Sequence, residues 1–99
     1  MDCDFFVRFA YRDVGYPMPL GIRNQAEQGV RITWANRRVG DVLFMDLVKN
    51  LDAGKADHVA IWTSQGYIID ASSYYERVTE HDFSNMYTRD DVLQVRRYR

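Results

Sequence analysis

The stretch HVAIWTSQGYIIDAS, residues 58–72, decides the fold because it reads as two β-strands joined by a tight turn. Its two outer segments are rich in β-branched and aromatic residues, which favour strands. Between them, residues 64–66 (SQG) are turn formers, and Gly66 tolerates the left-handed conformation that closes a three-residue hairpin loop. The stretch therefore predicts an antiparallel β-hairpin.

The register of this hairpin determines which side chains meet. A three-residue loop pairs Thr63 with Tyr67 and places Ala60 opposite Asp70. Asp70 then lies diagonal to His58 on the same face of the sheet, within reach of the imidazole. A two-residue loop would turn Asp70 to the other face and remove this contact. We therefore predict a His58–Asp70 contact that depends on the turn.

The rest of the chain places helices before this hairpin and strands around it. Phe6, Phe9 and Ala10 recur at helical spacing from residue 2 until Gly15, and residues 22–28 read as a short second helix. Further strand-like segments are VRITW (30–34), DVLFMDLV (41–48), YERVT (75–79) and VLQVRRY (92–98). The last one carries alternating arginines, which indicates an edge strand. The order predicts an α+β fold in which N-terminal helices pack on an antiparallel sheet of about five strands.

Composition limits the possible functions. The chain has 99 residues, is 46% hydrophobic and 27% charged, and carries a net charge of −1, which predicts one soluble domain spanning residues 1–99. Its single cysteine excludes an internal disulfide and a cysteine-rich zinc cluster. No signal peptide or membrane-length apolar run is visible, so we expect synthesis in the cytoplasm and no membrane partner. The near-neutral charge also argues against nucleic-acid binding by the C-terminal RRYR.

Three residues could together carry nucleophilic chemistry. Cys3 stands at the start of the first predicted helix, where backbone N–H groups and the helix dipole favour a thiolate and can receive an oxyanion. His58 could act as the base, and Asp70 could orient the imidazole. Each residue alone has a simpler interpretation as packing or surface. The residues by themselves support only Asp70 as an orienter of His58, conditional on the turn.

Four motifs in order resemble the NlpC-type family of papain-like cysteine peptidases: DCDFFVRFAYRDVGYPMP from residue 2, GDVLF from residue 40, HVAIW from residue 58 and YIIDASS from residue 67. The family's motifs read Asp-Cys-Ser-Gly-Phe and His-Val-Gly-Ile-Tyr. The resemblance implies that Cys3 is the nucleophile and His58 the base. Asp70 falls where the family places its third polar residue, most often histidine.

The resemblance also implies a substrate. Family members hydrolyse amide bonds in peptidoglycan stem peptides, commonly between γ-D-glutamate and a diamino acid, without a cofactor. Arginines could position such an acidic peptide, and the candidates are Arg23, Arg37, Arg38 and Arg77. A small peptidase without an export signal suits a phage lysin or a tail-associated hydrolase that acts at the bacterial cell wall.

Two departures from the family pattern keep other interpretations open. Asp4 and Phe5 stand where Ser-Gly is usual, and only Met1 and Asp2 precede the cysteine, where relatives carry a further segment. A partner chain or a missing upstream segment could complete the site. Alternatively, the domain could be catalytically impaired and act as a binding or assembly module.

Two further interpretations concern single residues. A zinc site formed by Cys3, His58 and Asp70 is the metal-based alternative, although no close-spaced ligand pair supports it and we expect no metal. His81 reads as a loop residue with no assigned role.

Overall fold

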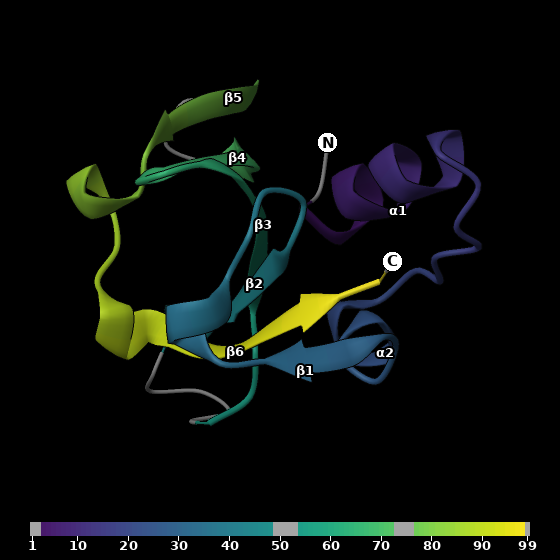
Figure 1. Ribbon diagram of the computed structural model, residues 1–99, viewed down its shortest axis with the longest axis horizontal. Coiled ribbons are helices and arrows are strands. Elements are labelled where there is room, and N and C mark those ends of the chain that lie inside the picture. The colour runs from purple at the N-terminus through teal and green to yellow at the C-terminus, as the bar shows by residue number, and fades with distance from the viewer. Residues whose placement is uncertain (1–2, 49–53, 73–76, 99) are drawn as a thin grey trace.

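The computed structural model describes residues 3–48, 54–72 and 77–98 and shows two helices packed on an antiparallel sheet (Figure 1). The sheet has six strands in the order β1-β6-β2-β3-β4-β5. The predicted α+β class is confirmed, with one strand more than the expected five. The elements are α1 (Cys3–Asp13), α2 (Ile22–Gln25), β1 (Val30–Ile32), β2 (Val42–Met45), β3 (His58–Ser64), β4 (Tyr67–Ser72), β5 (Arg77–Asp82) and β6 (Val92–Arg97), with short 3₁₀ helices at Trp34–Asn36, Phe83–Asn85 and Arg89–Asp91.

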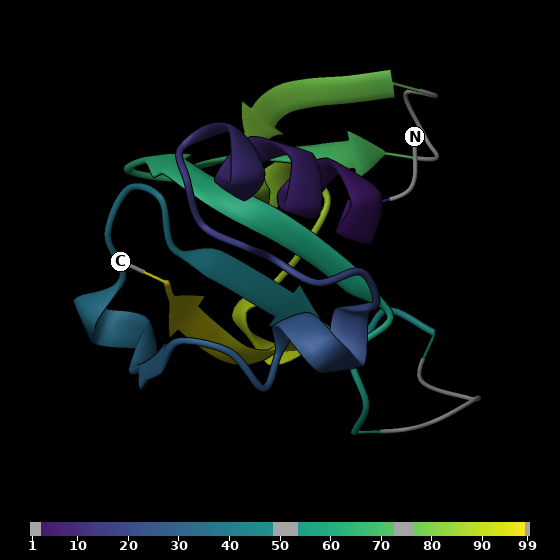
Figure 2. The ribbon, with the colours of Figure 1, turned by 90° about the vertical axis from the view of Figure 1, so that its right-hand side faces the viewer.

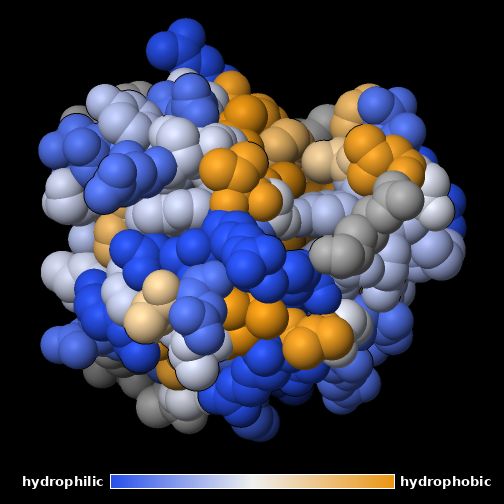
Figure 3. Space-filling model, viewed as in Figure 1, coloured by the Kyte–Doolittle hydropathy of each residue, from blue (hydrophilic) through white to orange (hydrophobic). Residues whose placement is uncertain are grey.

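Helix α1 lies across β3 and β4 on one face of the sheet (Figure 2). Val7 is its one fully buried residue, and Phe5 and Phe9 are exposed on its outer side, where Figure 3 shows apolar side chains over α1. The helix ends at Asp13, and Gly15 follows with a φ of 91°, a conformation that glycine adopts at little cost. The predicted first helix is therefore confirmed. Among the described residues, no helix is long and apolar enough to cross a bilayer.

The core has two parts because strand residues alternate between the two faces of the sheet. All of β2 is buried, and its residues divide between the two clusters. The cluster under α1 consists of Val7, Met18, Val42, Phe44, Val59 and Tyr98. The cluster on the opposite face consists of Leu43, Met45, Ala60, Trp62, Ile68, Phe83, Tyr87, Val92 and Val95. Each large apolar side chain buried in this way stabilises the fold by roughly 1.5–3 kcal/mol.

Strand β6 lies inside the sheet, between β1 and β2, so its prediction as an edge strand was wrong. The arginine that suggested an exposed edge has a buried partner. Arg97 Nε and Nη2 donate to the two carboxylate oxygens of Asp41, each over 2.8 Å, and Asp41 is only 1% exposed. This two-pronged pairing lets a charged strand occupy an interior position.

The β3–β4 hairpin reaches the predicted register by an unpredicted route. Ser64, not Thr63, pairs with Tyr67, so the loop has one residue fewer than expected. The register then shifts between Trp62 and Ser64, where Thr63 is an extra residue on β3. Ile61 pairs with Ile69 and Trp62 with Ile68, which is the register that the three-residue loop was expected to set. A short loop and a bulge therefore cancel, and the predicted facing of Asp70 is correct.

Strand β5 ends later than the segment 75–79 that the sequence indicated. It spans Arg77–Asp82 and pairs along its whole length with β4, including His81 opposite Ile68. Residues 75 and 76 lie outside the described part of the chain. His81 is thus a strand residue, and its interpretation as a loop residue was wrong.

Candidate active site

Cys3 is the first residue of α1, where the helix meets the sheet. It is half-buried among the apolar residues beneath α1. The backbone N–H groups of the first helical turn have no partners within the helix, so this end can stabilise a negative charge. Cys3 is the chain's single cysteine, so it is the one thiol that could act as a nucleophile.

Asp4 and Gln25 fasten this end of α1 to the following segment. The Asp4 carboxylate accepts a hydrogen bond from the backbone N–H of Gly21 over 3.0 Å. Gln25, which is fully buried, donates from Nε2 to the backbone carbonyls of Asp4 (2.8 Å) and Pro19 (2.9 Å). The Asp4 carboxylate, an unusual neighbour for a reactive cysteine, is therefore used to hold the helix in place.

His58 opens β3 and interacts with side chains on both sides. Its Nε2–H donates to Asp70 Oδ2 over 2.7 Å, which confirms the contact predicted from the hairpin register. Burial lowers the pKa of His58, but hydrogen bonds with Asp70 and with Cys3 outweigh burial and raise that pKa from 6.5 to about 9. Asp70 thus bonds the imidazole directly, and Cys3 lies close enough to His58 to raise its pKa.

Asp70 is the buried anion of the group and accepts three hydrogen bonds. Besides His58, His81 Nε2–H donates to Oδ1 over 2.7 Å, and the Tyr87 hydroxyl donates to Oδ2 over 3.0 Å. Asp70 is 0% exposed, and His81 and Tyr87 are 8% and 7% exposed. Burial raises the pKa of Asp70, but the bonds from these donors outweigh burial and hold that pKa below its usual value.

His81 and Tyr87 are the residues that sequence reasoning missed. His81 comes from β5, and Tyr87 follows the 3₁₀ helix Phe83–Asn85. Burial, together with the nearby Asp70 carboxylate, raises the pKa of Tyr87, so its hydroxyl keeps its proton. One signal for His81 was available: it is one of only two histidines in the chain, and it follows a strand-like segment next to the one that contains Asp70.

The metal-based alternative requires at least three ligating side chains around one point. In the part of the chain that the structure describes, no group of three or more His, Cys, Asp or Glu side chains is arranged to hold a metal ion. His58 and Asp70 instead bond directly to each other. A hydrogen-bonded chain is the arrangement that supports proton transfer.

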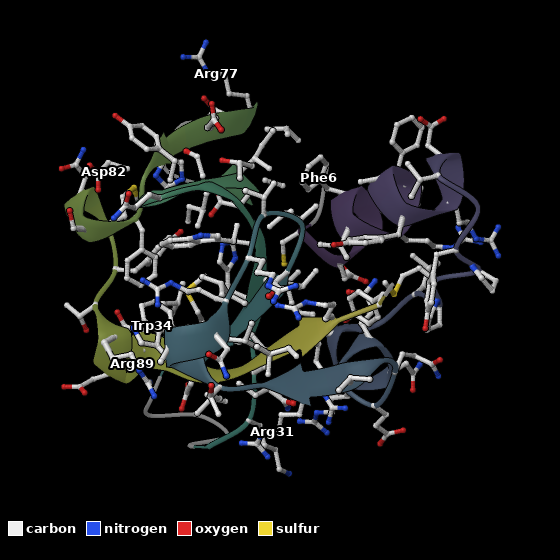
Figure 4. All side chains as sticks on the ribbon, in the orientation of Figure 1. Phe6, Arg31, Trp34, Arg77, Asp82 and Arg89 are labelled. Carbon is white, nitrogen blue, oxygen red and sulfur yellow. The ribbon has the colours of Figure 1, made fainter. Side chains whose placement is uncertain are left out.

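Arg37, one of the four arginines considered for substrate binding, is engaged elsewhere. Its guanidinium lies 3.9 Å from the ring centre of Trp34 and 4.4 Å from that of Trp62. Arg89 lies over the same Trp34 ring. Figure 4 shows Trp34 and Arg89 at the end of the molecule away from α1. Burial and the nearby Arg89 charge lower the pKa of Arg37. The stacking gives Arg37 a role in packing.

Solved structures with the same arrangement of helices and strands are known. NlpC2 from Trichomonas vaginalis is 26% identical, with a TM-score of 0.86 over 98% of this chain and 36% of that one. An NlpC/P60 family protein from Bacillus cereus is 21% identical, with a TM-score of 0.85 over 99% of this chain and 32% of that one. The peptidoglycan hydrolase RipB from Mycobacterium tuberculosis is 24% identical, with a TM-score of 0.80 over 98% of this chain and 44% of that one.

An N-terminal helix packed on a six-stranded antiparallel sheet is the NlpC/P60 fold. The sequence profile of the NlpC/P60 family matches residues 1–97, so the chain belongs to that family. The resemblance drawn from the four motifs is thereby confirmed. This chain spans less than half the length of each of the three solved structures. No curated protein sequence matches it.

Proposed function

We propose that this protein is a cysteine peptidase that hydrolyses amide bonds in the stem peptides of peptidoglycan, with Cys3 as nucleophile, His58 as general acid and base, and Asp70 as the residue that orients His58. The single observation that carries the proposal is the 2.7 Å bond between His58 and the buried Asp70 carboxylate, in a structure where the chain's one cysteine stands at the start of α1 and raises the pKa of His58.

The geometry suggests how each proton moves. Because Nε2 of His58 is bonded to Asp70, Nδ1 is left to exchange the proton with the Cys3 thiol. The thiolate attacks the substrate carbonyl carbon, and the resulting oxyanion is stabilised by free N–H groups at the start of α1. His58 protonates the leaving amine as the C–N bond breaks, which leaves a thioester on Cys3. His58 then removes a proton from water, which attacks the thioester, releases the acid and regenerates the thiol.

For the substrate we propose the amide bond between γ-D-glutamate and a diamino acid. Its support is the membership of the NlpC/P60 family together with a fold like that of RipB, which is described as a peptidoglycan hydrolase. The Asp4 carboxylate and the Phe5 ring leave the chemistry unobstructed, because Asp4 bonds to Gly21 and Phe5 is 46% exposed on the outside of α1.

The test combines purified peptidoglycan with a synthetic γ-D-glutamyl-diamino acid peptide, using the wild-type chain and Cys3→Ala. We expect the wild type to release a new primary amine and a new γ-D-glutamyl carboxylate, identified by mass spectrometry. Cys3→Ala should be inactive, at least 10³-fold slower, while keeping the wild-type circular dichroism spectrum. Equal activity in both proteins would exclude Cys3 as the nucleophile. No activity in either would favour the catalytically impaired binding module.

For the biological setting we propose a phage lysin or a tail-associated hydrolase that acts at the bacterial cell wall. The test is expression of the chain in bacteria with and without an added export signal. We expect loss of wall integrity only when the chain is exported, and only with Cys3 present. Wall damage that is independent of Cys3 would count against this setting.

A further inference from the structure

Two histidines, His58 and His81, form hydrogen bonds with the Asp70 carboxylate, whereas the proposed triad uses only His58. His58 Nε2 and His81 Nε2 each lie 2.7 Å from it, one on each oxygen. Asp70 is completely buried, so both oxygens depend on protein donors. His81 and Tyr87 have no part in the mechanism described above, although their polar atoms point at its third member.

The two additional donors restrain Asp70 in complementary ways. His81, on β5, donates to Oδ1 over 2.7 Å, and Tyr87 donates to Oδ2 over 3.0 Å. The Tyr87 hydroxyl also lies 3.3 Å from Nε2 of His58. A carboxylate bonded at both oxygens cannot rotate about its Cβ–Cγ bond without breaking one of these contacts. Its orientation toward His58 is therefore determined by residues outside the triad.

The surroundings of Asp70 make this restraint necessary. Strand β4 carries Asp70 into the cluster that contains Ile68 and Trp62, where an unpaired carboxylate would be costly. One donor could not satisfy both oxygens, and two or three donors keep such a group ionised. An ionised Asp70 is what stabilises an imidazolium at His58 during proton transfer.

We propose that His81 and Tyr87 are positioning residues that hold the Asp70 carboxylate ionised and in a single orientation behind His58, so that the working unit is a five-residue network. The inference deepens the proposed function and rests on it. The titratable groups that face Asp70 are His58 from β3, His81 from β5 and the Tyr87 hydroxyl, and Cys3 from α1 lies beyond His58.

The test uses substitutions that remove one donor at a time. Tyr87→Phe removes only the hydroxyl, His81→Leu removes the ring donor, and His81→Gln restores an N–H at similar reach. The matched control is Tyr98→Phe, which deletes another buried tyrosine hydroxyl, bonded to the Gln25 carbonyl, in the cluster under α1. Thermal unfolding identifies variants that have lost the fold.

Two measurements follow the network without requiring a substrate. The ¹³Cγ chemical shift reports the pH at which Asp70 takes up a proton, and the rate of Cys3 alkylation by iodoacetamide at neutral pH reports whether His58 is correctly placed. We expect Tyr87→Phe and His81→Leu each to raise the Asp70 midpoint by about 0.5–1 pH unit and to slow alkylation about 3- to 10-fold. Tyr98→Phe should leave both unchanged, and His81→Gln should recover most of the loss.

The proposal is overturned if a folded Tyr87→Phe, and His81→Leu where it folds, leave the Asp70 midpoint and the alkylation rate at wild-type values. It is also overturned if Tyr98→Phe produces the same shifts. These readouts separate the inference from the proposed function. A shifted midpoint in a protein that does not cleave peptidoglycan supports the network and rejects the substrate, whereas cleavage with unshifted midpoints does the reverse.

Discussion

The two sides of the candidate site are built differently. Cys3 lies at the first residue of α1, a helix with one fully buried residue, whose first turn is held by hydrogen bonds from Gly21 and Gln25. His58 and Asp70 belong to central strands of a six-stranded sheet and share a buried network of hydrogen bonds. The nucleophile is thus carried by a helix that packs on one face of the sheet, and the base by strands inside the sheet.

This contrast shows where the site is open to change. Displacing α1 would break its packing in the cluster beneath it and alter the distance between the thiol and the imidazole. Displacing His58 requires breaking the sheet or leaving the Asp70 carboxylate buried without its donors. Alterations on the sheet side should therefore change the chemistry most, and alterations on the helix side should change mainly the placement of Cys3.

The largest effect is expected for His58→Ala, which removes the group that connects the two sides. Hydrolysis should fall at least 10³-fold, because neither the thiol nor the leaving amine has a proton partner. Iodoacetamide alkylation of Cys3, measured from pH 4 to 10, should change from fast and nearly pH-independent at neutrality to the steep rise of an isolated thiol. An unchanged alkylation profile would show that the two sides do not communicate.

Asp70→Asn should have an intermediate effect, about 10- to 100-fold on hydrolysis. The amide nitrogen cannot accept from His58 or His81, so burial is no longer outweighed and the pKa of His58 should fall from about 9. The alkaline limb of the pH–rate profile should therefore shift to lower pH.

A matched control for this change is Asp41→Asn, which alters a second buried aspartate that pairs with Arg97, outside the network. It should lower stability and leave the position of the alkaline limb unchanged. An alkaline limb at the same pH in the wild type, Asp70→Asn and Asp41→Asn would mean that Asp70 does not act through His58.

Gln25→Ala tests the helix side alone. It leaves the carbonyls of Asp4 and Pro19 without their donor, so urea unfolding should show a loss of about 2 kcal/mol. Hydrolysis should fall only about 3- to 10-fold, with the pH–rate profile unchanged in shape. Gln28→Ala, an exposed control three positions along, should stay within about 0.5 kcal/mol of the wild type. A shift in the pH–rate profile would show that α1 also tunes the base.

The smallest effect concerns the pH dependence of stability. The pKa of His58 is raised in the folded state from 6.5 to about 9, so its stabilisation is fully present below pH 6.5 and is lost as the pH rises through 9. Urea unfolding should show the free energy of unfolding declining over that interval. His58→Ala should flatten this slope, and a slope that persists in the variant would assign it to another group.

Much of the sheet side could be predicted from sequence, because strand propensity and period-2 facing are local properties. The segment 67–72 matches β4 in full, and the register of Asp70 is correct from Ile61↔Ile69 onward. The bulge at Thr63 could not be predicted, because it depends on tertiary bonds. Phe83 N–H donates to the Gly66 carbonyl over 2.8 Å, and the Thr63 hydroxyl donates to Glu80.

The misses share a cause. His81 lies in RVTEHD, whose own residues favour a strand weakly, and it becomes a strand residue because β4 offers a free edge to pair with. Arg97 signalled an exposed edge because its partner Asp41 is 56 positions away in the chain. In both cases a distant pairing outweighed the local signal.

The bulge at Thr63 also separates the hairpin tip from the chemistry. Thr63 is an extra residue on β3 between the Ser64↔Tyr67 pair and the Ile61↔Ile69 pair. The length of the turn therefore does not by itself fix the register of the strand residues that carry the proposed triad. Deleting Thr63 would give a regular hairpin with the same loop and leave Asp70 facing His58. Gln65, exposed at the tip, is consequently a place where a fluorescent probe or an affinity handle can be attached without moving the network. The same tolerance would allow related chains to differ in hairpin length while keeping a common arrangement of nucleophile and base.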